Sequence, residues 1–209
     1  MSVSSRPSTT SRTSALFTYR TIDIVTVATL GVAVGVAFWG WDQLYAVVSN
    51  LSAFAFPPSV GLLAGTWLVG GVIGGLVVRR PGAALMTELI AASVEALLGN
   101  QWGFGTIVSG LIQGVGVEIV LALFLFRRFG LVVAALAGIL AASMESVYEW
   151  FAYYPDWDLA YRLAYLGFFA ASGALVAGLG GWALVRALAA TGALDALPAG
   201  REYHDRQAI

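Results

Sequence analysis

The sequence predicts an all-α integral membrane protein, and three observations support this fold class. Hydrophobic residues make up 59% of the 209 residues and charged residues only 11%, whereas soluble domains carry about 25% charged residues. The mean hydropathy is +0.81. The apolar residues also fall into segments long enough to cross a bilayer as helices. We therefore expect one compact bundle of six transmembrane helices with no separate soluble domain.

Residues 1–20 precede the first apolar segment. They are rich in Ser, Thr and Arg, contain no acidic residue and lack the apolar core of a secretory signal. We expect them to form a disordered cytoplasmic tail. A transit peptide has a similar composition and is the alternative.

Proline, glycine and arginine punctuate the apolar segments that follow. Pro57-Pro58 precedes the second segment, Arg79-Arg80-Pro81 ends it, Gly99-Asn100 forms a plausible C-cap of the third, and Arg127-Arg128 ends the fourth. The loop YYPDWD separates the last two. The expected transmembrane domain covers residues 21–189, with helices at about 21–40, 60–78, 82–98, 105–126, 131–152 and 160–188, followed by a cytoplasmic tail at 190–209.

The first helix carries a stripe of small residues. Gly31 and Gly35, like Ala33 and Ala37, are four residues apart, a spacing that lets another helix approach closely. Packing within the chain and packing on a partner subunit explain this pattern equally well. Trp39, Trp41, Asp42 and Tyr45 then form an aromatic exit typical of a membrane interface.

The distribution of arginine predicts the orientation. The chain contains no lysine, and with six spans ten of its eleven arginines fall on one side and only Arg162 on the other. The positive-inside rule places the arginine-rich side, with both termini, in the cytoplasm.

Carboxylates and amides interrupt the apolar segments. Each ionisable side chain at membrane depth costs ~2.5 to 3.5 kcal/mol, so such residues are functional candidates. Seven residues separate Glu88 from Glu95, which places both on one helix face. A protonated, hydrogen-bonded interhelical carboxyl is the alternative for any one of them. The full set of candidates is Glu88, Glu95, Asn100, Trp102, Gln113, Glu118, Glu145, Tyr148, Glu149, Trp150 and Tyr154.

Most of these candidates fall in the outer half of the expected bundle, which suggests a pocket open to the outside. Several carboxylates, many aromatic rings and a single nearby arginine suit a cation or a donor-rich heteroaromatic ligand rather than a phosphate. Without cysteine, and with His204 the only histidine, we expect no metal site, no cofactor and no Ser-His or Cys-His catalysis. Nothing in the sequence indicates nucleic-acid binding.

The run PGAAL-xx-E-x(6)-E-xLLGN, followed by QG-x-G-x-E, resembles the signature of the YkoE family. RRP before it, SGAL-x-AG at residues 172–178 and TG-x-L at 191–194 are also similar to that family. Its members are thiamine and hydroxymethylpyrimidine S components of energy-coupling-factor (ECF) transporters. The resemblance implies a six-helix bacterial plasma-membrane subunit that captures the vitamin at the outer face. It also implies partners in the lipid bilayer and beneath it, a membrane coupling subunit and a pair of cytoplasmic ATPases.

By motif position, the resemblance implies roles for individual residues. We expect Glu95 and Glu149 to hold the aminopyrimidine and offset the thiazolium charge, and Asn100 and Gln113 to fix the ring orientation. The expected stacking partners are Trp102, Trp150 or Tyr154. Glu88 and Glu118 lie deeper, and a protonated interhelical pair is the alternative for them. Gly31, Ala33, Gly35 and Ala37 are the expected docking surface for the coupling subunit.

Two other function classes stay open at this stage. A proton-coupled secondary transporter of a cationic or heteroaromatic molecule would use mid-membrane carboxylates such as Glu88 and Glu118. An intramembrane enzyme would have only Asp or Glu chemistry available. The sequence contains no phosphate-binding loop, so any ATP hydrolysis is expected in partner subunits.

Overall fold

The computed structural model describes residues 17–207, so the expected disorder of residues 1–16 lies outside the described part of the chain. The described chain is helical, with no strand among residues 17–207, which confirms the all-α prediction. The elements are α2 (Thr21–Val48), η1 (Ser52–Phe54), η2 (Pro57–Val60), α3 (Gly61–Ala64), η3 (Gly65–Leu68), α4 (Val69–Val78), α5 (Ala83–Leu98), α6 (Gly105–Leu123), α7 (Leu131–Ala152), α8 (Leu159–Ser172), η4 (Gly173–Gly180), α9 (Gly181–Ala190) and α10 (Pro198–Gln207).

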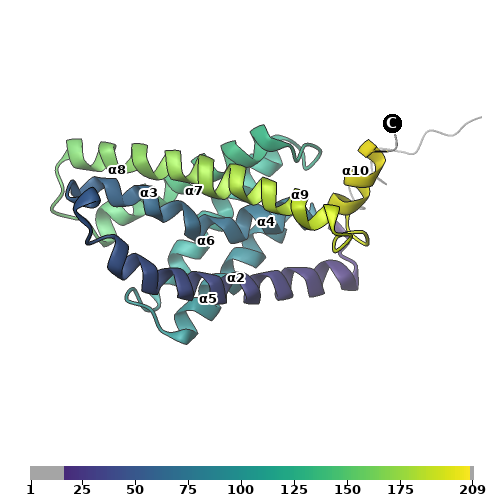
Figure 1. Ribbon diagram of the computed structural model, residues 1–209, viewed down its shortest axis with the longest axis horizontal. Helices are drawn as coiled ribbons and strands as arrows, with labels where there is room; N and C mark the ends of the chain where they lie inside the picture. The colour runs from purple at the N-terminus through teal and green to yellow at the C-terminus, as the bar shows by residue number, and fades with distance from the viewer. Residues whose placement is uncertain (1–16, 208–209) are drawn as a thin grey trace, which may run out of the picture.

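Five helical segments in the described chain are long and apolar enough to cross a membrane. They cover residues 21–48, 57–78, 105–123, 131–152 and 159–190. The expected third span corresponds to α5, which has only 16 residues and packs between α2, α4 and α6. Figure 1 shows α2 on one side of the bundle and the continuous α8–η4–α9 helix on the other.

Two expected helix ends are wrong. The first helix continues to Val48 rather than ending near residue 40, because Asp42 turns inward and accepts a hydrogen bond from Trp67 Nε1 at 3.0 Å. The loop between the first two spans therefore begins only after Val48. The fourth helix ends at Leu123 rather than at 126, because Leu125 and Phe126 have left-handed backbones, with φ of 55° and 52°.

The second span is not one regular α-helix. It changes from α to 3-10 winding at Gly65, where the Ser172 hydroxyl accepts from the Gly65 N–H at 3.1 Å and donates to the Leu62 carbonyl at 2.6 Å. A Cβ at Gly65 would lie 2.5 Å from the Ser172 carbonyl oxygen. The close contact with α8–η4 therefore requires glycine there. Downstream of Ser172, residues 173–180 are π-helical and continue without a break into α9.

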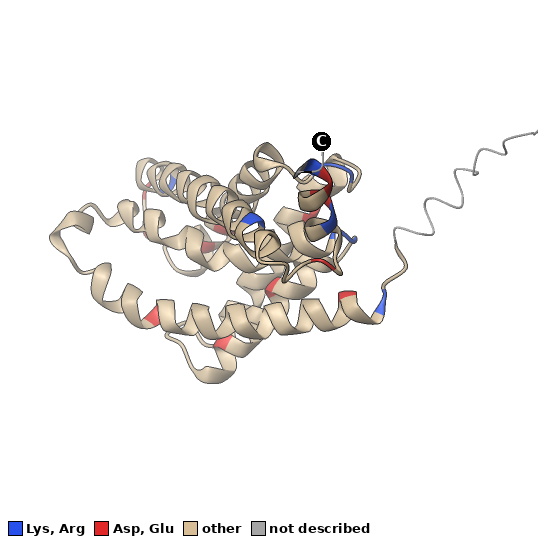
Figure 2. Ribbon diagram, turned by 45° about the vertical axis from the view of Figure 1, so that its right-hand side comes forward, with Lys and Arg blue, Asp and Glu red and all other residues tan. Residues whose placement is uncertain are grey.

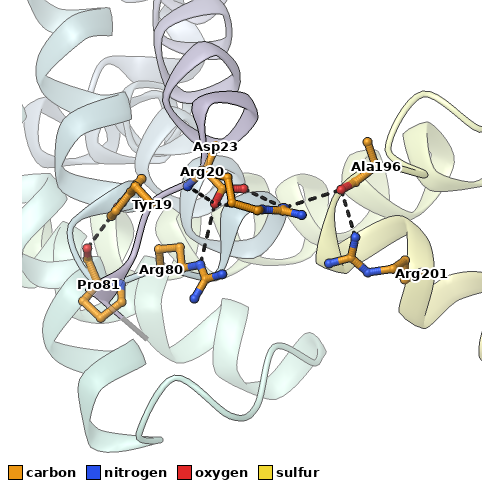
Figure 3. A network of polar contacts seen from close by, with 7 residues as sticks. All are labelled: Tyr19, Arg20, Asp23, Arg80, Pro81, Ala196 and Arg201. Carbon is orange, nitrogen blue, oxygen red and sulfur yellow. Dashed lines mark hydrogen bonds and ion pairs between the residues drawn. The ribbon is translucent and has the colours of Figure 1, made fainter. Parts of the chain in front are cut away.

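At one end of the bundle, polar contacts join three separate parts of the chain (Figure 3). The Asp23 side chain is fully buried and pairs with Arg20 at 2.7 Å and with Arg80 at 3.7 Å. Arg20 also donates to the Ala196 carbonyl, which Arg201 contacts at 2.9 Å. Tyr19 donates to the Pro81 carbonyl at 3.0 Å. We call this the arginine end of the bundle.

The C-terminal segment is more closely integrated than a separate tail would be. Leu194, Leu197 and Ala199 are buried in the hydrophobic core. Helix α10 then packs on α9 and on the end of α4, where Arg79 pairs with Glu202 at 2.5 Å. Much of the segment expected as a tail is therefore helical, and it is held against the bundle.

Candidate functional site

A cavity of about 590 Å³ lies inside the bundle, far along the helices from the arginine end. The lining comes from α2, α3, η3, α5, α6, α7 and α8, and its polar groups include four glutamates. The sequence-predicted residues that line it are Glu88, Glu95, Trp102, Gln113, Glu145, Glu149 and Tyr154.

Helix spacing explains why the four glutamates meet. Glu88 and Glu95 are two turns apart on α5, and both are almost fully buried. Glu145 and Glu149 are one turn apart on α7. Since α5 and α7 both pack against α6, the two pairs face each other across the cavity. Figure 2 shows acidic residues within the bundle, away from the end where basic residues gather.

Glu95 is positioned by the turn that follows α5. The Asn100 amide donates to Glu95 at 3.1 Å and to the Thr106 hydroxyl at 2.7 Å. The Asn100 side-chain oxygen in turn accepts from the backbone N–H of Trp102, at 3.0 Å. Asn100 therefore orients Glu95 and the Trp102 loop without lining the cavity itself.

Glu88 closes the deep end of the cavity. Its carboxylate accepts a short hydrogen bond from the Gly71 backbone N–H. With its amide nitrogen turned toward Glu88, Gln113 donates to Glu88 Oε1 at 3.2 Å and to the Trp67 carbonyl at 3.0 Å. These contacts link α4, α5 and α6 directly below the cavity.

Glu145 makes the fewest hydrogen bonds of the four glutamates. Its side chain is 1% exposed, and neither carboxylate oxygen makes a hydrogen bond of accepted geometry within the described chain, although Ser109 and Gln113 lie near. Glu149, by contrast, accepts a short hydrogen bond from the Tyr165 hydroxyl. A buried carboxylate without a partner costs free energy, and a bound cation or donor would recover it.

Aromatic rings form the rest of the wall. Trp67 and Trp102 meet edge to face with centroids 5.2 Å apart, and Tyr45 lies 5.1 Å from Trp67 and 5.7 Å from Trp102. Burial raises the pKa of the Tyr153 and Tyr154 hydroxyls, which follow α7. Both hydroxyls are therefore neutral at physiological pH and can donate hydrogen bonds.

Four of the predicted residues lie outside the cavity lining. Asn100 acts through Glu95, as described above. Tyr148 packs edge to face on Tyr153, and Trp150 is partly buried against the core with its Nε1 unpartnered in the described chain. Glu118 accepts from the Ala84 N–H at 2.9 Å at the first turn of α5. The suggested Glu88–Glu118 pair is wrong, because each carboxylate is bound to a different backbone segment.

The small-residue stripe on α2 is split between two faces. Gly31 and Gly35 are buried against α5, where an added Cβ would lie 2.6 Å from Ile90 and from the Ala91 carbonyl oxygen, respectively. Ala33 and Ala37 are exposed. The glycines therefore serve packing within the chain, and the two alanines remain open to a partner.

The sequence did not identify several residues of the candidate site, namely Asp42, Tyr45, Trp67, Thr106, Ser109 and Tyr165. Asp42 was assigned to the membrane interface. It interacts with the Glu95 carboxyl group and is only 3% exposed. A signal was present in the spacing, because Val27, Gly31, Gly35, Phe38 and Asp42 follow the three- and four-residue steps of one buried helix face.

Comparison with known proteins gives three matches. Residues 22–144 match the family model described as "ABC-type cobalt transport system, permease component". The chain is 34% identical over 187 residues to "Putative HMP/thiamine permease protein YkoE" of Bacillus subtilis (strain 168), covering 88% of this chain and 92% of that protein. A solved structure titled "Crystal structure of an S-component of ECF transporter" superposes with a TM-score of 0.84 at 32% identity, covering 91% of this chain and 95% of that one.

These relatives are substrate-binding subunits of transporters rather than enzymes. The matches extend over nearly the whole described bundle, including the cavity and the helices that build it. The chain therefore belongs to the YkoE family of ECF transporter S components and is a multi-pass plasma membrane protein.

Proposed function

We propose that this subunit captures thiamine or its hydroxymethylpyrimidine precursor at the outer face of the membrane, for ATP-driven import by partner subunits. The observation that supports it best is the unpartnered Glu145 carboxylate inside a cavity walled by Trp67, Trp102 and Tyr154. A cation or a hydrogen-bond donor is the complement of such a group. The similarity to an HMP/thiamine permease names a ligand class with both properties.

The chemistry of the aminopyrimidine suits the cavity. A carboxylate accepts from an exocyclic amine, and aromatic faces attract a delocalised cation by ~0.5 to 2 kcal/mol per contact. We assign the amine to Glu145 together with Glu95 and Glu149, ring orientation to Gln113, and stacking to Trp102 or Tyr154. Asp42 and Glu95 bring two carboxyl groups together, and a nearby thiazolium would relieve their repulsion.

Cobalt, which the matched family model names, fits these residues poorly. Residues 17–207 contain no group of three His, Cys, Asp or Glu side chains placed to hold a metal ion. Divalent cobalt prefers nitrogen and sulfur donors in a converging set. Carboxylates spread around an aromatic cavity suit an organic ligand better.

In this proposal α5 also crosses the membrane, which gives six spans, and both termini are cytoplasmic, as the arginine distribution indicates. The coupling subunit docks on the exposed Ala33 and Ala37 face of α2, and ATP hydrolysis belongs to cytoplasmic partner subunits. Substituting leucine at both alanines is expected to abolish co-purification with the coupling subunit and to leave ligand binding unchanged. Loss of binding in that variant would show that the face has another role.

Calorimetric titration of the detergent-purified chain tests the ligand. Thiamine, hydroxymethylpyrimidine and oxythiamine, in which an oxo group replaces the exocyclic amine, are titrated against wild type, Glu95→Gln and Glu202→Gln. Glu202 is a matched control because it lies at the arginine end. We expect thiamine or hydroxymethylpyrimidine to bind both the wild type and Glu202→Gln. Binding to Glu95→Gln is expected to be weak or absent. Oxythiamine is expected to bind weakly throughout.

Absence of binding by folded wild-type protein would reject the vitamin proposal. Uptake by this chain alone that collapses with the proton gradient would favour the proton-coupled transporter instead.

A further inference from the structure

A second cavity lies at the arginine end, and its lining differs from that of the first. Its volume is about 600 Å³, and it is bounded by the end of α4, the turn before α7, helix α9 and helix α10. Three guanidinium groups and three aromatic rings dominate its lining. They belong to Arg79, Arg186, Arg206, Phe129, Trp182 and Tyr203.

The charges in this cavity do not balance. Glu202 is the only acidic residue of the lining, and it pairs with Arg79 at 2.5 Å and with Arg206. Counting three arginines against one glutamate leaves a charge of +2. Arg186 takes part in none of the ion pairs among residues 17–207. It lies instead over the rings of Trp182, at 5.1 Å, and Tyr203, at 5.5 Å.

The arginines are also held in place. Arg79 adopts a left-handed backbone with φ of 57°, which is uncommon outside glycine. Its Nε donates to the Leu76 carbonyl at 3.0 Å, and its guanidinium lies 4.7 Å from the Phe129 ring centre. The aromatic rings that contact Arg79 and Arg186 therefore hold two positive charges beside the same cavity. Such an arrangement suits an anion with several acceptor oxygens, above all a phosphate.

The surroundings favour a lipid as the source of that phosphate. The cavity also has an aliphatic lining, which includes Leu131 and Val185. Large apolar side chains next in sequence, Val132 and Leu184, are 69% and 46% exposed and would face acyl chains. Basic pockets between helices on the cytoplasmic side of a membrane commonly bind acidic headgroups. Figure 2 shows basic residues gathered at this end, beside the C-terminal helix.

We propose that the cavity under α10 binds the phosphate of an acidic phospholipid, with Arg186 as the principal contact and Arg79 and Arg206 beside it. This inference goes beyond the proposed function, because the site lies at the opposite end of the bundle from the vitamin cavity. It predicts a lipid that remains bound when the protein is extracted in mild detergent.

Native mass spectrometry of the purified full chain tests this inference, with phosphatidylglycerol, phosphatidylcholine or inorganic phosphate added at equal concentration. We expect a retained phosphatidylglycerol adduct and a higher thermal midpoint with that lipid alone. In Arg186→Gln the adduct is expected to fall about tenfold, as for loss of one charge-assisted contact. The matched control is Arg162→Gln, at the other end of the bundle, which is expected to retain the adduct.

Three results would overturn the proposal. Equal retention of phosphatidylcholine, whose phosphate is balanced by a choline cation, would mean that the net negative charge of the lipid is not recognised. An undiminished adduct in Arg186→Gln would place the lipid elsewhere. Stabilisation by inorganic phosphate to the same midpoint would assign the site to free phosphate. If Arg186→Gln does not fold, Arg206→Gln provides the same test, because the Arg206 side chain is 65% exposed.

Discussion

The two ends of the bundle treat buried charge in opposite ways. At the arginine end Asp23 lies between Arg20 and Arg80, and Glu202 lies between Arg79 and Arg206. At the cavity end carboxyl groups lie near one another and near aromatic rings, and neither Glu145 oxygen makes a hydrogen bond of accepted geometry within the described chain. Paired charges hold helix ends together, whereas unpaired carboxylates store the free energy that a ligand can recover. In the proposed function, one end therefore contributes stability and the other binding.

The largest expected effect comes from replacing the Glu145 carboxyl group. Glu145→Gln is expected to weaken vitamin binding by about 10- to 100-fold, because a hydrogen bond to a charged group becomes a neutral one. The ligand-free variant is expected to unfold at nearly the same temperature, since neither oxygen of the replaced carboxyl group makes a hydrogen bond of accepted geometry within the described chain. Calorimetric titration and thermal unfolding measure the two quantities. If Glu145→Gln lowered the stability of the ligand-free protein by as much free energy as it lowered vitamin binding, the contrast between the two ends would be wrong.

Asp23→Ala is expected to show the reverse pattern. It removes the carboxylate that accepts hydrogen bonds from Arg20 at the start of α2, so the free energy of unfolding should fall by about 2 kcal/mol. Vitamin affinity of the folded fraction should not change. Denaturant unfolding followed by titration measures both. Asp195→Ala, at an exposed side chain, is the control and should stay within about 0.5 kcal/mol of wild type.

Glu118 separates the two roles within one helix, because it follows the cavity residue Gln113 on α6. Glu118→Ala removes the acceptor for the Ala84 N–H and is expected to cost about 1 to 2 kcal/mol of stability, as for a lost helix cap. Thermal unfolding and titration of the variant again provide the test. An affinity loss like that of Glu145→Gln would mean that Glu118 reaches the ligand.

The smallest expected effect is that of acid on helix α10. Partial burial alone would raise the pKa of Glu202, but Arg79 and Arg206 outweigh it and hold that pKa below its ordinary value. The stabilisation by Glu202 is therefore present above the ordinary glutamate pKa and is lost as the pH falls through the lowered one. Hydrogen exchange at residues 198–207, corrected for its intrinsic pH dependence, should increase on acidification in wild type. In Glu202→Gln it should not respond.

Much of the fold could be predicted from the sequence because the signals are local. Apolar segment length, Pro57-Pro58 and the arginine pairs mark helix ends to within a few residues in most cases. The missed extension of α2 has a tertiary cause. Asp42 resembles an interfacial residue until Trp67, 25 positions later, supplies its hydrogen bond. No pattern within α2 alone contains that partner.

The sequence predicted which carboxylates lie around the cavity better than it predicted their contacts. Carboxylates within apolar helices identified Glu88, Glu95, Glu145 and Glu149, since such residues are costly wherever they occur. Their partners depend on which helix faces which, and a sequence does not give that. Thr106, Ser109 and Tyr165 look like ordinary membrane-helix residues, and only packing brings them to the cavity.

The π-helical stretch at residues 173–180 affects which side of the longest helical segment its buried residues lie on. From Tyr165 to Ala189 a buried residue occurs at every fourth position, at 165, 169, 173, 177, 181, 185 and 189. In a regular α-helix each four-residue step overshoots a full turn by roughly 40°, so six steps would carry this row about 240° around the axis. The π-helical residues in the middle have more residues per turn, which reduces this rotation of the buried row around the axis. Buried residues spaced four apart match neither a heptad repeat nor an ideal α-helix. With the π-helical stretch between them, they stay closer to one side of this helical segment.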